Sequence, residues 1–175
     1  MFIKEVTTNL NAEIMPFLTS TIPVNPDKIL VIDEMPIVSL AMQEIFRMVN
    51  IAAVVEYTDN IFTALSSATY QSSGFDLIII GSQQDVFPDN LHELIEELKG
   101  RFRKARIMLF AAIYDPAIIE KMEVSGIDAY VHKYEPLEEI RKTYMRLSAG
   151  ESYISAIFRT LYSEYGLDRG KARDR

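Results

Sequence analysis

The chain has 175 residues, a formal net charge of −7 and a hydrophobic fraction of 49%, which together indicate one globular domain with its own core. The acidic balance argues against a large phosphate-binding surface, so we expect no direct nucleic-acid binding by this chain. Because the sequence holds no cysteine, disulfides, thiolate metal sites and a cysteine nucleophile are excluded. No apolar run reaches the roughly 18 residues of a membrane span and no signal peptide is recognisable, so we expect no membrane partner and a cytoplasmic location.

Residues 1–26 form an extension with scattered apolar side chains. The sequence allows two interpretations of it equally, a short helix docked on the domain and a mobile arm. The sequence KILVIDEMP follows at residues 28–36. Its four consecutive apolar residues predict a strand that is buried on both faces, as in a parallel sheet. Asp33 and Glu34 come directly after this strand, at the end where open α/β sheets place their sites. Pro36 then fits the first turn of a helix.

Apolar runs and helical patterns alternate through the next part of the chain. We expect further strands at 51–56, 75–81, 105–112 and 127–132, and helices at 36–50, 59–70, 88–100, 116–124 and 136–150. Five strand–helix repeats within about 120 residues predict a parallel sheet with helices on both faces. The expected architecture for residues 27–150 is a flavodoxin-like (βα)5 doubly wound α/β fold, with strand order 2-1-3-4-5.

Residues 151–175 are expected to add an amphipathic helix and a charged tail. Apolar residues recur over 153–165 at i, i+3, i+4, i+7, i+8 and i+11, which is a wide helical stripe. An exposed stripe of this size would be an aggregation liability or a binding site. We therefore expect the helix to fold back on the domain or to pair with its twin in a dimer, and a separate partner is the remaining alternative.

Three stretches resemble response-regulator receiver domains, the CheY-like family. KILVIDEMP, FDLIIIG and GIDAYVHKYEPLEEI occur in the family's order, and the closing AGESYIS is similar to the NarL/LuxR class. The resemblance covers residues 28–155. It implies a phosphorylation site in which an acid pair binds Mg²⁺, an Asp accepts the phosphoryl group, and a Ser or Thr and a Lys follow the fourth and fifth strands. Phosphoryl transfer needs an in-line nucleophile and cations that neutralise the phosphate oxygens.

The resemblance assigns the acid pair to Asp33 and Glu34 and the lysine to Lys133. It also assigns to Tyr130 the aromatic position that changes rotamer on activation, and a plain core aromatic is an equally good interpretation. Taken alone, the two acids would be read as solvated groups at a strand end. A further alternative is that Lys133 pairs with one of them as a structural ion pair.

Two positions depart from the family pattern. The phosphoacceptor position is Gly81 and the hydroxyl position is Ala111. Glycine offers no side-chain nucleophile, so the resemblance implies a degenerate site that is not phosphorylated in the usual way. Without a third carboxylate, Asp33 and Glu34 should hold Mg²⁺ weakly at most, and we expect no other cofactor. On this view Gly81→Asp would restore Mg²⁺ binding.

These observations predict an atypical, aspartate-less receiver that acts in signal transduction through protein–protein interaction, with a homodimer as the expected assembly. The expected interaction face combines charged residues of the helix at 136–150 with the apolar stripe after it: Arg141, Lys142, Ile157, Phe158 and Leu161. One alternative is the receiver part of a DNA-binding transcriptional regulator, because residues 151–175 are too few for a helix-turn-helix output domain. Another is a small-ligand-sensing pseudo-receiver, and an enzyme is not expected because no triad, glycine-rich phosphate loop or metal cluster appears.

Overall fold

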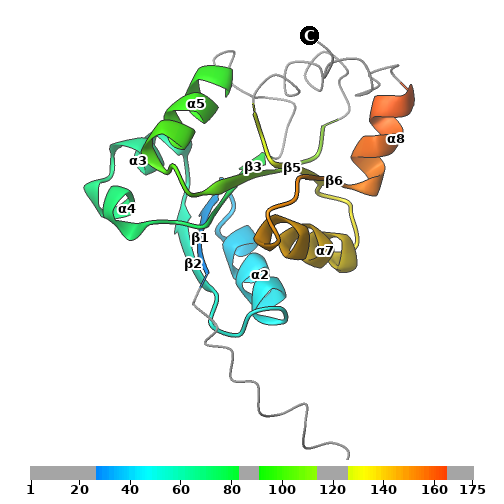
Figure 1. Cartoon of the computed structure of the whole chain (residues 1–175), viewed down its shortest axis with the longest axis horizontal. Helices are drawn as coiled ribbons and strands as arrows, with labels where there is room; N and C mark the ends of the chain where they lie inside the picture. The colour runs from blue at the N-terminus through cyan, green and yellow to red at the C-terminus, as the bar shows by residue number, and fades with distance from the viewer. Residues whose placement is uncertain (1–26, 83–90, 114–125, 165–175) are drawn as a thin grey trace, which may run out of the picture.

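A single parallel sheet organises the molecule, in a computed structural model that describes residues 27–82, 91–113 and 126–164 (Figure 1). Its strand order is β2-β1-β3-β4-β5-β6, and every neighbouring pair is parallel. The strands are β1 (Lys28–Ile32), β2 (Val54–Thr58), β3 (Leu77–Ser82), β4 (Arg106–Ala111), β5 (Ala129–His132) and β6 (Tyr153–Ile154). The expected α/β fold and the order 2-1-3-4-5 are confirmed, with a sixth strand added at the β5 edge.

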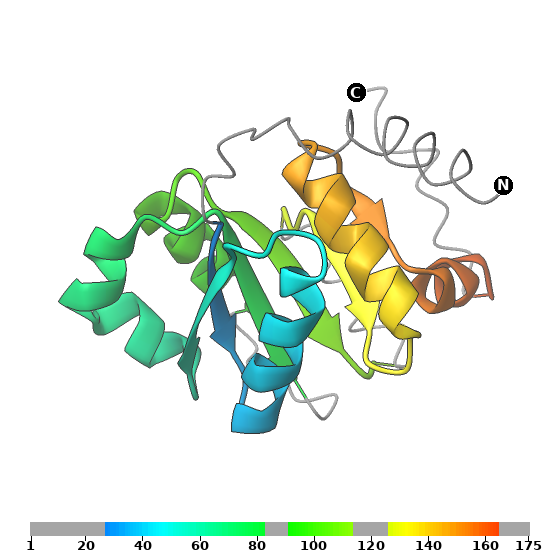
Figure 2. The same cartoon turned by 90° about the horizontal axis from the view of Figure 1, so that it is seen from below.

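Helices cover both faces of the sheet, as the two views show (Figures 1 and 2). Helices α2 and α7 lie on one face, and α3, α5 and α8 contribute to the core on the other. The helices are α2 (Pro36–Arg47), α3 (Ile61–Ser66), α4 (Ala68–Ser73), α5 (Leu91–Arg101), α7 (Leu137–Ser148) and α8 (Ala156–Glu164). None of the described helices is long and apolar enough to cross a membrane.

The apolar run of β1 shows why this sheet needs consecutive hydrophobic residues. Successive strand side chains point to opposite faces. Ile29 and Val31 therefore pack under α2 and α7, whereas Leu30 and Ile32 pack under α3, α5 and α8. Because helices cover both faces, neither set could be polar without burying an unpaired group.

Strand β2 lies three residues later than the sequence predicted. It pairs in register with β1 from Lys28↔Val54 onward. Ile51, which was expected to begin the strand, lies in a turn and is 85% exposed. The correction follows from pairing, because register with β1 rather than local apolar content decides which residues form the strand.

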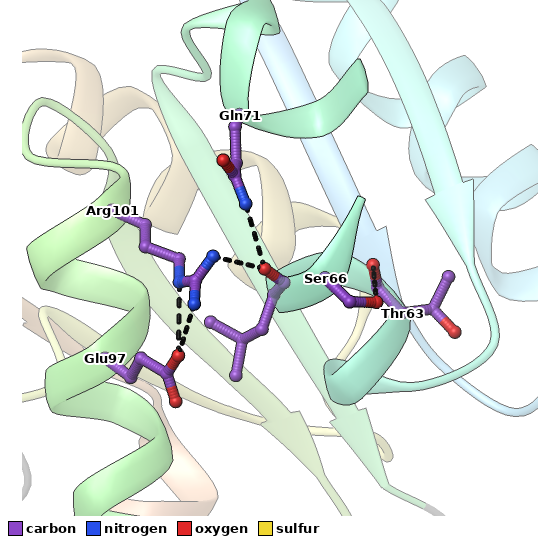
Figure 3. Close-up of polar contacts among 6 residues, drawn as sticks. Thr63, Ser66, Gln71, Glu97 and Arg101 are labelled. Atoms are coloured by element: carbon purple, nitrogen blue, oxygen red, sulfur yellow. Dashed lines mark hydrogen bonds and ion pairs between the residues drawn. The ribbon is translucent and has the colours of Figure 1, made fainter. Parts of the chain in front are cut away.

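The single helix expected between the second and third strands is two short helices, α3 and α4. The chain breaks at Ser67, which has an extended ψ of 118° and caps α4 through its side chain. The freed carbonyl of Leu65 accepts hydrogen bonds from Gln71 Nε2 at 3.1 Å and from Arg101 Nη1 at 2.5 Å (Figure 3). The same guanidinium also donates a hydrogen bond from Arg101 Nη2 to Glu97 Oε1 at 2.7 Å. The break is thus stabilised by α4 and α5, which no local pattern reveals.

The C-terminal helix folds back onto the sheet, which is one of the arrangements left open from the sequence, but it begins later than predicted. Tyr153 and Ile154 form β6 beside β5, with Ala129↔Tyr153 in register, and α8 starts at Ala156. Phe158 is fully buried in the core. Residues 153–164 therefore share one sheet and one core with the rest of the domain. The extension at 1–26, the helix expected at 116–124, the start of the helix expected at 88–100 and the tail after 164 lie outside the described residues.

Candidate functional site

Asp33, Gly81 and Lys133 come together at the carboxyl edge of the sheet. Asp33 directly follows β1, Gly81 lies near the end of β3, and Lys133 directly follows β5. Strand alternation places all three on the face covered by α2 and α7, because each comes two residues after a core residue of that face. Those core residues are Val31, Ile79 and Val131. The fold thus assembles the site from positions 100 residues apart in sequence.

A buried ion pair is the centre of this site. Lys133 Nζ lies 2.9 Å from Asp33 Oδ2, and the two side chains are 14% and 0% exposed. The other carboxylate oxygen, Oδ1, accepts a hydrogen bond from the backbone N–H of Met35 at 2.8 Å. The ammonium also lies 5.5 Å from the centroid of the Phe110 ring. Each oxygen of the carboxylate therefore has a partner, which a buried charge requires.

Gly81 makes room for this carboxylate. A Cβ atom at residue 81 would lie 1.8 Å from Asp33 Oδ2, 2.6 Å from its Cγ and 2.9 Å from its Cβ. Such distances are far below van der Waals contact, so no side chain fits at residue 81 while Asp33 keeps this position. The Asp33 carboxylate occupies the volume in which a side chain at residue 81 would begin.

The donor set at this edge does not fit Mg²⁺. Both Asp33 oxygens are engaged, and the ammonium of Lys133 already supplies a positive charge beside one of them. Glu34 is exposed. Within 27–82, 91–113 and 126–164, no three acidic, histidine or cysteine side chains are grouped as a metal site requires. The expectation for Gly81→Asp also needs revision, since the new side chain would first have to displace Asp33.

Ala111 does not join the ion pair. It is fully buried in the core on the opposite face, with the residues of α3, α5 and α8. By alternation, Ala112 is the residue that follows Phe110 on the face of Asp33, and it is half-buried. Gly81 and Ala111 therefore do not share one space for a small ligand, because the Asp33 carboxylate fills the volume above Gly81 and Ala111 lies on the opposite face of the sheet.

Tyr130 is a core aromatic sealed by α8. It is 1% exposed, and its ring centroid lies 6.2 Å from that of Phe158 and 6.5 Å from that of Tyr162, both edge-on. Phe158 and Leu161 are themselves buried, so they belong to the core rather than to a free interaction face, and Ile157 is partly buried. The prediction that placed Phe158 and Leu161 on an interaction face is wrong, because α8 packs these side chains against the domain itself, whereas for Ile157 it stays a prediction.

Sequence reasoning missed the residues that fasten α8. Glu135 is buried, and its Oε1 accepts a hydrogen bond from the backbone N–H of Ile157 at 2.6 Å, in the first turn of α8. Ser155 Oγ accepts from the backbone N–H of His132 at 3.2 Å. The His132 ring lies 5.5 Å from that of Phe158, and burial lowers the pKa of His132 while Glu135 partly opposes this. No local pattern signals the Glu135 contact, because Ile157 lies 22 residues further along the chain.

The charged residues expected on the interaction face are paired within α7. Arg141 Nη1 lies 3.3 Å from Glu138 Oε2, and Lys142 Nζ lies 3.2 Å from Glu139 Oε1. Tyr153 also donates a hydrogen bond to Glu139 at 2.7 Å, and this bond is the main cause that lowers the pKa of Glu139. Each of these bases therefore has an acidic neighbour on its own helix, and their part in an interaction face stays a prediction.

Comparisons with known proteins locate the fold. The sequence matches no family model and no curated protein. The isolated REC domain of RcsB from Salmonella enterica serovar Typhimurium, in the presence of the phosphomimetic BeF3⁻, superposes with a TM-score of 0.64 at 18% identity, over 78% of this chain and 99% of that one. A structure of two RcsB dimers bound to two parallel DNAs gives a TM-score of 0.65 at 20% identity, over 79% of this chain and 69% of that one.

A LuxR family DNA-binding response regulator from Silicibacter pomeroyi is also similar, with a TM-score of 0.61 at 14% identity, over 75% of this chain and 98% of that one. These identities are low, so the likeness concerns the fold. The chain has the flavodoxin-like fold of response-regulator receiver domains.

Proposed function

We propose that this chain is an aspartate-less receiver that acts in signal transduction through protein contacts and is not phosphorylated at residue 81. The observation that carries the proposal is the Asp33 carboxylate above Gly81, where it is held by Lys133 at 2.9 Å. Residue 81 lacks a nucleophile for the same reason that Asp33 can lie above it, because only glycine leaves room for this carboxylate.

The ion pair also accounts for the lysine. A phosphoryl group needs cations around its oxygens, and Lys133 is the cation that the site offers. Here Asp33 supplies the anion instead, so the ammonium is neutralised without any phosphate. We infer one resting state for this edge of the sheet, in which the described residues of the receiver and the docked α8 present their surfaces to a protein partner in the cytoplasm or to a second copy. No catalytic role is proposed.

Incubation with Mg²⁺ and acetyl phosphate, followed by intact-mass spectrometry, tests the proposal. We expect no added phosphoryl group on this protein, whereas a receiver that has its phosphoacceptor aspartate gains one under the same conditions. A single phosphoryl group that maps by peptide analysis to Asp33 or to another carboxylate of the sheet edge would overturn the proposal.

The receiver part of a DNA-binding regulator is a second candidate, favoured by the likeness to RcsB. This chain covers 69% of the length of the RcsB chain in the DNA complex. Both candidates use the same receiver and differ in whether an output domain is attached to its carboxyl end. A helix-turn-helix segment encoded in the same reading frame beyond residue 175 would favour the regulator, and an in-frame stop codon there would favour the self-standing module.

A further inference from the structure

The turn that joins the end of α2 to the start of β2 is apolar, although surface turns are normally polar (Figure 1). Its residues 48–54 read MVNIAAV and carry no charge. Ile51 is 85% exposed, Met48 64%, Val54 47% and Val49 38%. We call these four residues the turn patch. Four large apolar side chains gathered on one exposed turn mark a contact surface rather than a connection that only faces water.

Hydrogen bonds within the turn fix its shape. Asn50 Oδ1 accepts a hydrogen bond from the backbone N–H of Ala52 at 3.0 Å, and the Asn50 carbonyl accepts one from the backbone N–H of Ala53 at 2.9 Å. Ala53 is buried, so one side of the turn packs against the domain. The exposure of the turn patch shows that the described part of the chain leaves the other side open.

The chain enters the domain at this same turn. Asp27, which precedes β1, is fastened to the turn at two points. Its carbonyl accepts a hydrogen bond from the backbone N–H of Val54 at 2.9 Å, and its Oδ2 accepts one from Asn50 Nδ2 at 3.1 Å. Consecutive Cα atoms are only ~3.8 Å apart. The N-terminal extension, residues 1–26, therefore joins the domain at the edge of the turn patch.

The extension has the composition of a segment that can cover an apolar surface. Its only charged residues are Lys4, Glu5 and Glu13, on a chain in which 25% of all residues are charged. Its densest apolar run is IMPFL at residues 14–18. The chain between Leu18 and Asp27 can span up to about 30 Å when extended, so this run can reach every residue of the turn patch.

We propose that residues 14–18 dock on the turn patch of the same chain, with Phe17 and Leu18 as the apolar anchors. The point of attachment selects this occupant. A segment joined through so short a linker has an effective concentration in roughly the millimolar range, so it occupies the patch ahead of a second copy or another protein of similar intrinsic affinity at micromolar concentration. The removal of apolar surface from water on both sides drives the contact. The extension thereby closes this surface to other proteins, and the inference is independent of the proposal for residue 81.

Chymotrypsin cleavage of the full chain tests the docking, because this protease cuts after Phe17 and Leu18 only while they are released from the patch. We expect the wild type to be cut there at least about tenfold more slowly than a synthetic peptide of residues 10–26. Ile51→Ser should be cut at least about tenfold faster than the wild type, because it removes the largest contact of the patch. Phe62→Ser is the matched control, since Phe62 is 61% exposed on α3, at the other face of the sheet, and should leave the rate unchanged.

Three results would overturn the proposal. Equal cleavage rates for the wild type and Ile51→Ser would show that the turn patch does not hold the extension. A wild-type extension that is cut as fast as the synthetic peptide would assign the patch to a separate protein. Protection that increases with protein concentration would assign the patch to a second copy, because docking within one chain does not depend on concentration.

Melting temperatures of full-chain variants measure the contact itself. Phe17→Ser and Ile51→Ser should each lower the melting temperature by about 3–6 °C, because each removes one large apolar side chain from the contact. The double variant should fall no further than the more affected single variant, because both substitutions remove the same contact. An Ile51 side chain that faces water would lose nothing on substitution, so an unchanged melting temperature for Ile51→Ser overturns the proposal. Additive falls in the double variant overturn it as well.

Discussion

His132 and Lys133 are neighbours at the end of β5, and their side chains serve opposite faces of the sheet. Lys133 reaches Asp33 on the face of α2 and α7 through a buried ion pair. His132 packs against Phe158 on the other face, where Glu135 and Ser155 fasten α8. One strand end thus supports two different attachments, which differ in the kind of force that holds them.

This difference predicts how strongly a single substitution at each attachment changes the stability of the protein. The Asp33–Lys133 pair depends on two buried charges, so removing or displacing either one leaves the other uncompensated. The α8 attachment depends on apolar packing with one helix cap, so the loss of any single member is partly absorbed by the rest. The first should therefore respond to single substitutions at the site far more than the second.

Gly81→Ala is expected to have the largest effect. The new Cβ would lie 1.8 Å from Asp33 Oδ2, so Asp33 must leave its position and break the buried pair. Breaking such a pair costs about 3–5 kcal/mol. Urea unfolding followed by circular dichroism should show the midpoint fall accordingly.

Gly100→Ala is the matched control for this substitution. Gly100 lies inside helix α5, and a Cβ there meets no atom within 4 Å. We expect it to leave stability unchanged or to raise it by up to about 1 kcal/mol, because alanine is the better helix former. Equal destabilisation by both variants would show that the space above Gly81 is not special.

Glu135→Ala is expected to have an intermediate effect. It removes the carboxylate that accepts from the Ile157 N–H in the first turn of α8, and loss of a helix cap costs about 1–2 kcal/mol. Glu135→Gln keeps an acceptor oxygen and should retain most of the stability in the same unfolding assay. A Glu135→Gln variant as unstable as Glu135→Ala would argue against the cap.

The smallest expected effect is a pH dependence at His132. Burial lowers the pKa of His132 below its ordinary 6.5 in the folded protein. The unfolded chain therefore binds a proton that the folded one resists, so stability should decline as the pH falls from about 6.5 toward the lower folded pKa. Melting temperatures between about pH 7.5 and 5 should show this decline, and His132→Gln should flatten it. An unchanged slope in the variant would assign the decline to other groups.

The sequence predicted the sheet well because its buried strands are continuous apolar runs. It placed β2 too early, since the apolar residue Ile51 cannot be told from a strand residue until the register with β1 is known. It missed β6, because Tyr153 and Ile154 fit a helical stripe as well as a strand. Such choices depend on tertiary pairing, which a local pattern does not contain.

At the site, the sequence was enough to predict that Asp33 and Lys133 lie close together, because the strand order follows from the fold. It could not choose between Asp33 and Glu34 as the partner of Lys133, and it assigned Ala111 to a face that the strand register excludes. Nor could it reveal that the carboxylate fills the space above Gly81, since that depends on side-chain rotamers in three dimensions.

A double-mutant cycle between residues 33 and 81 tests the central claim most directly. In a background that carries Asp33→Gly with Lys133→Met, the ion pair is gone and none of the three Asp33 atoms that a Cβ at residue 81 would meet remains. If the Asp33 carboxylate is what excludes a side chain there, Gly81→Ala should cost about 1 kcal/mol or less in this background against about 3–5 kcal/mol in the wild type. An equal cost in both backgrounds, measured by urea unfolding, would contradict the account.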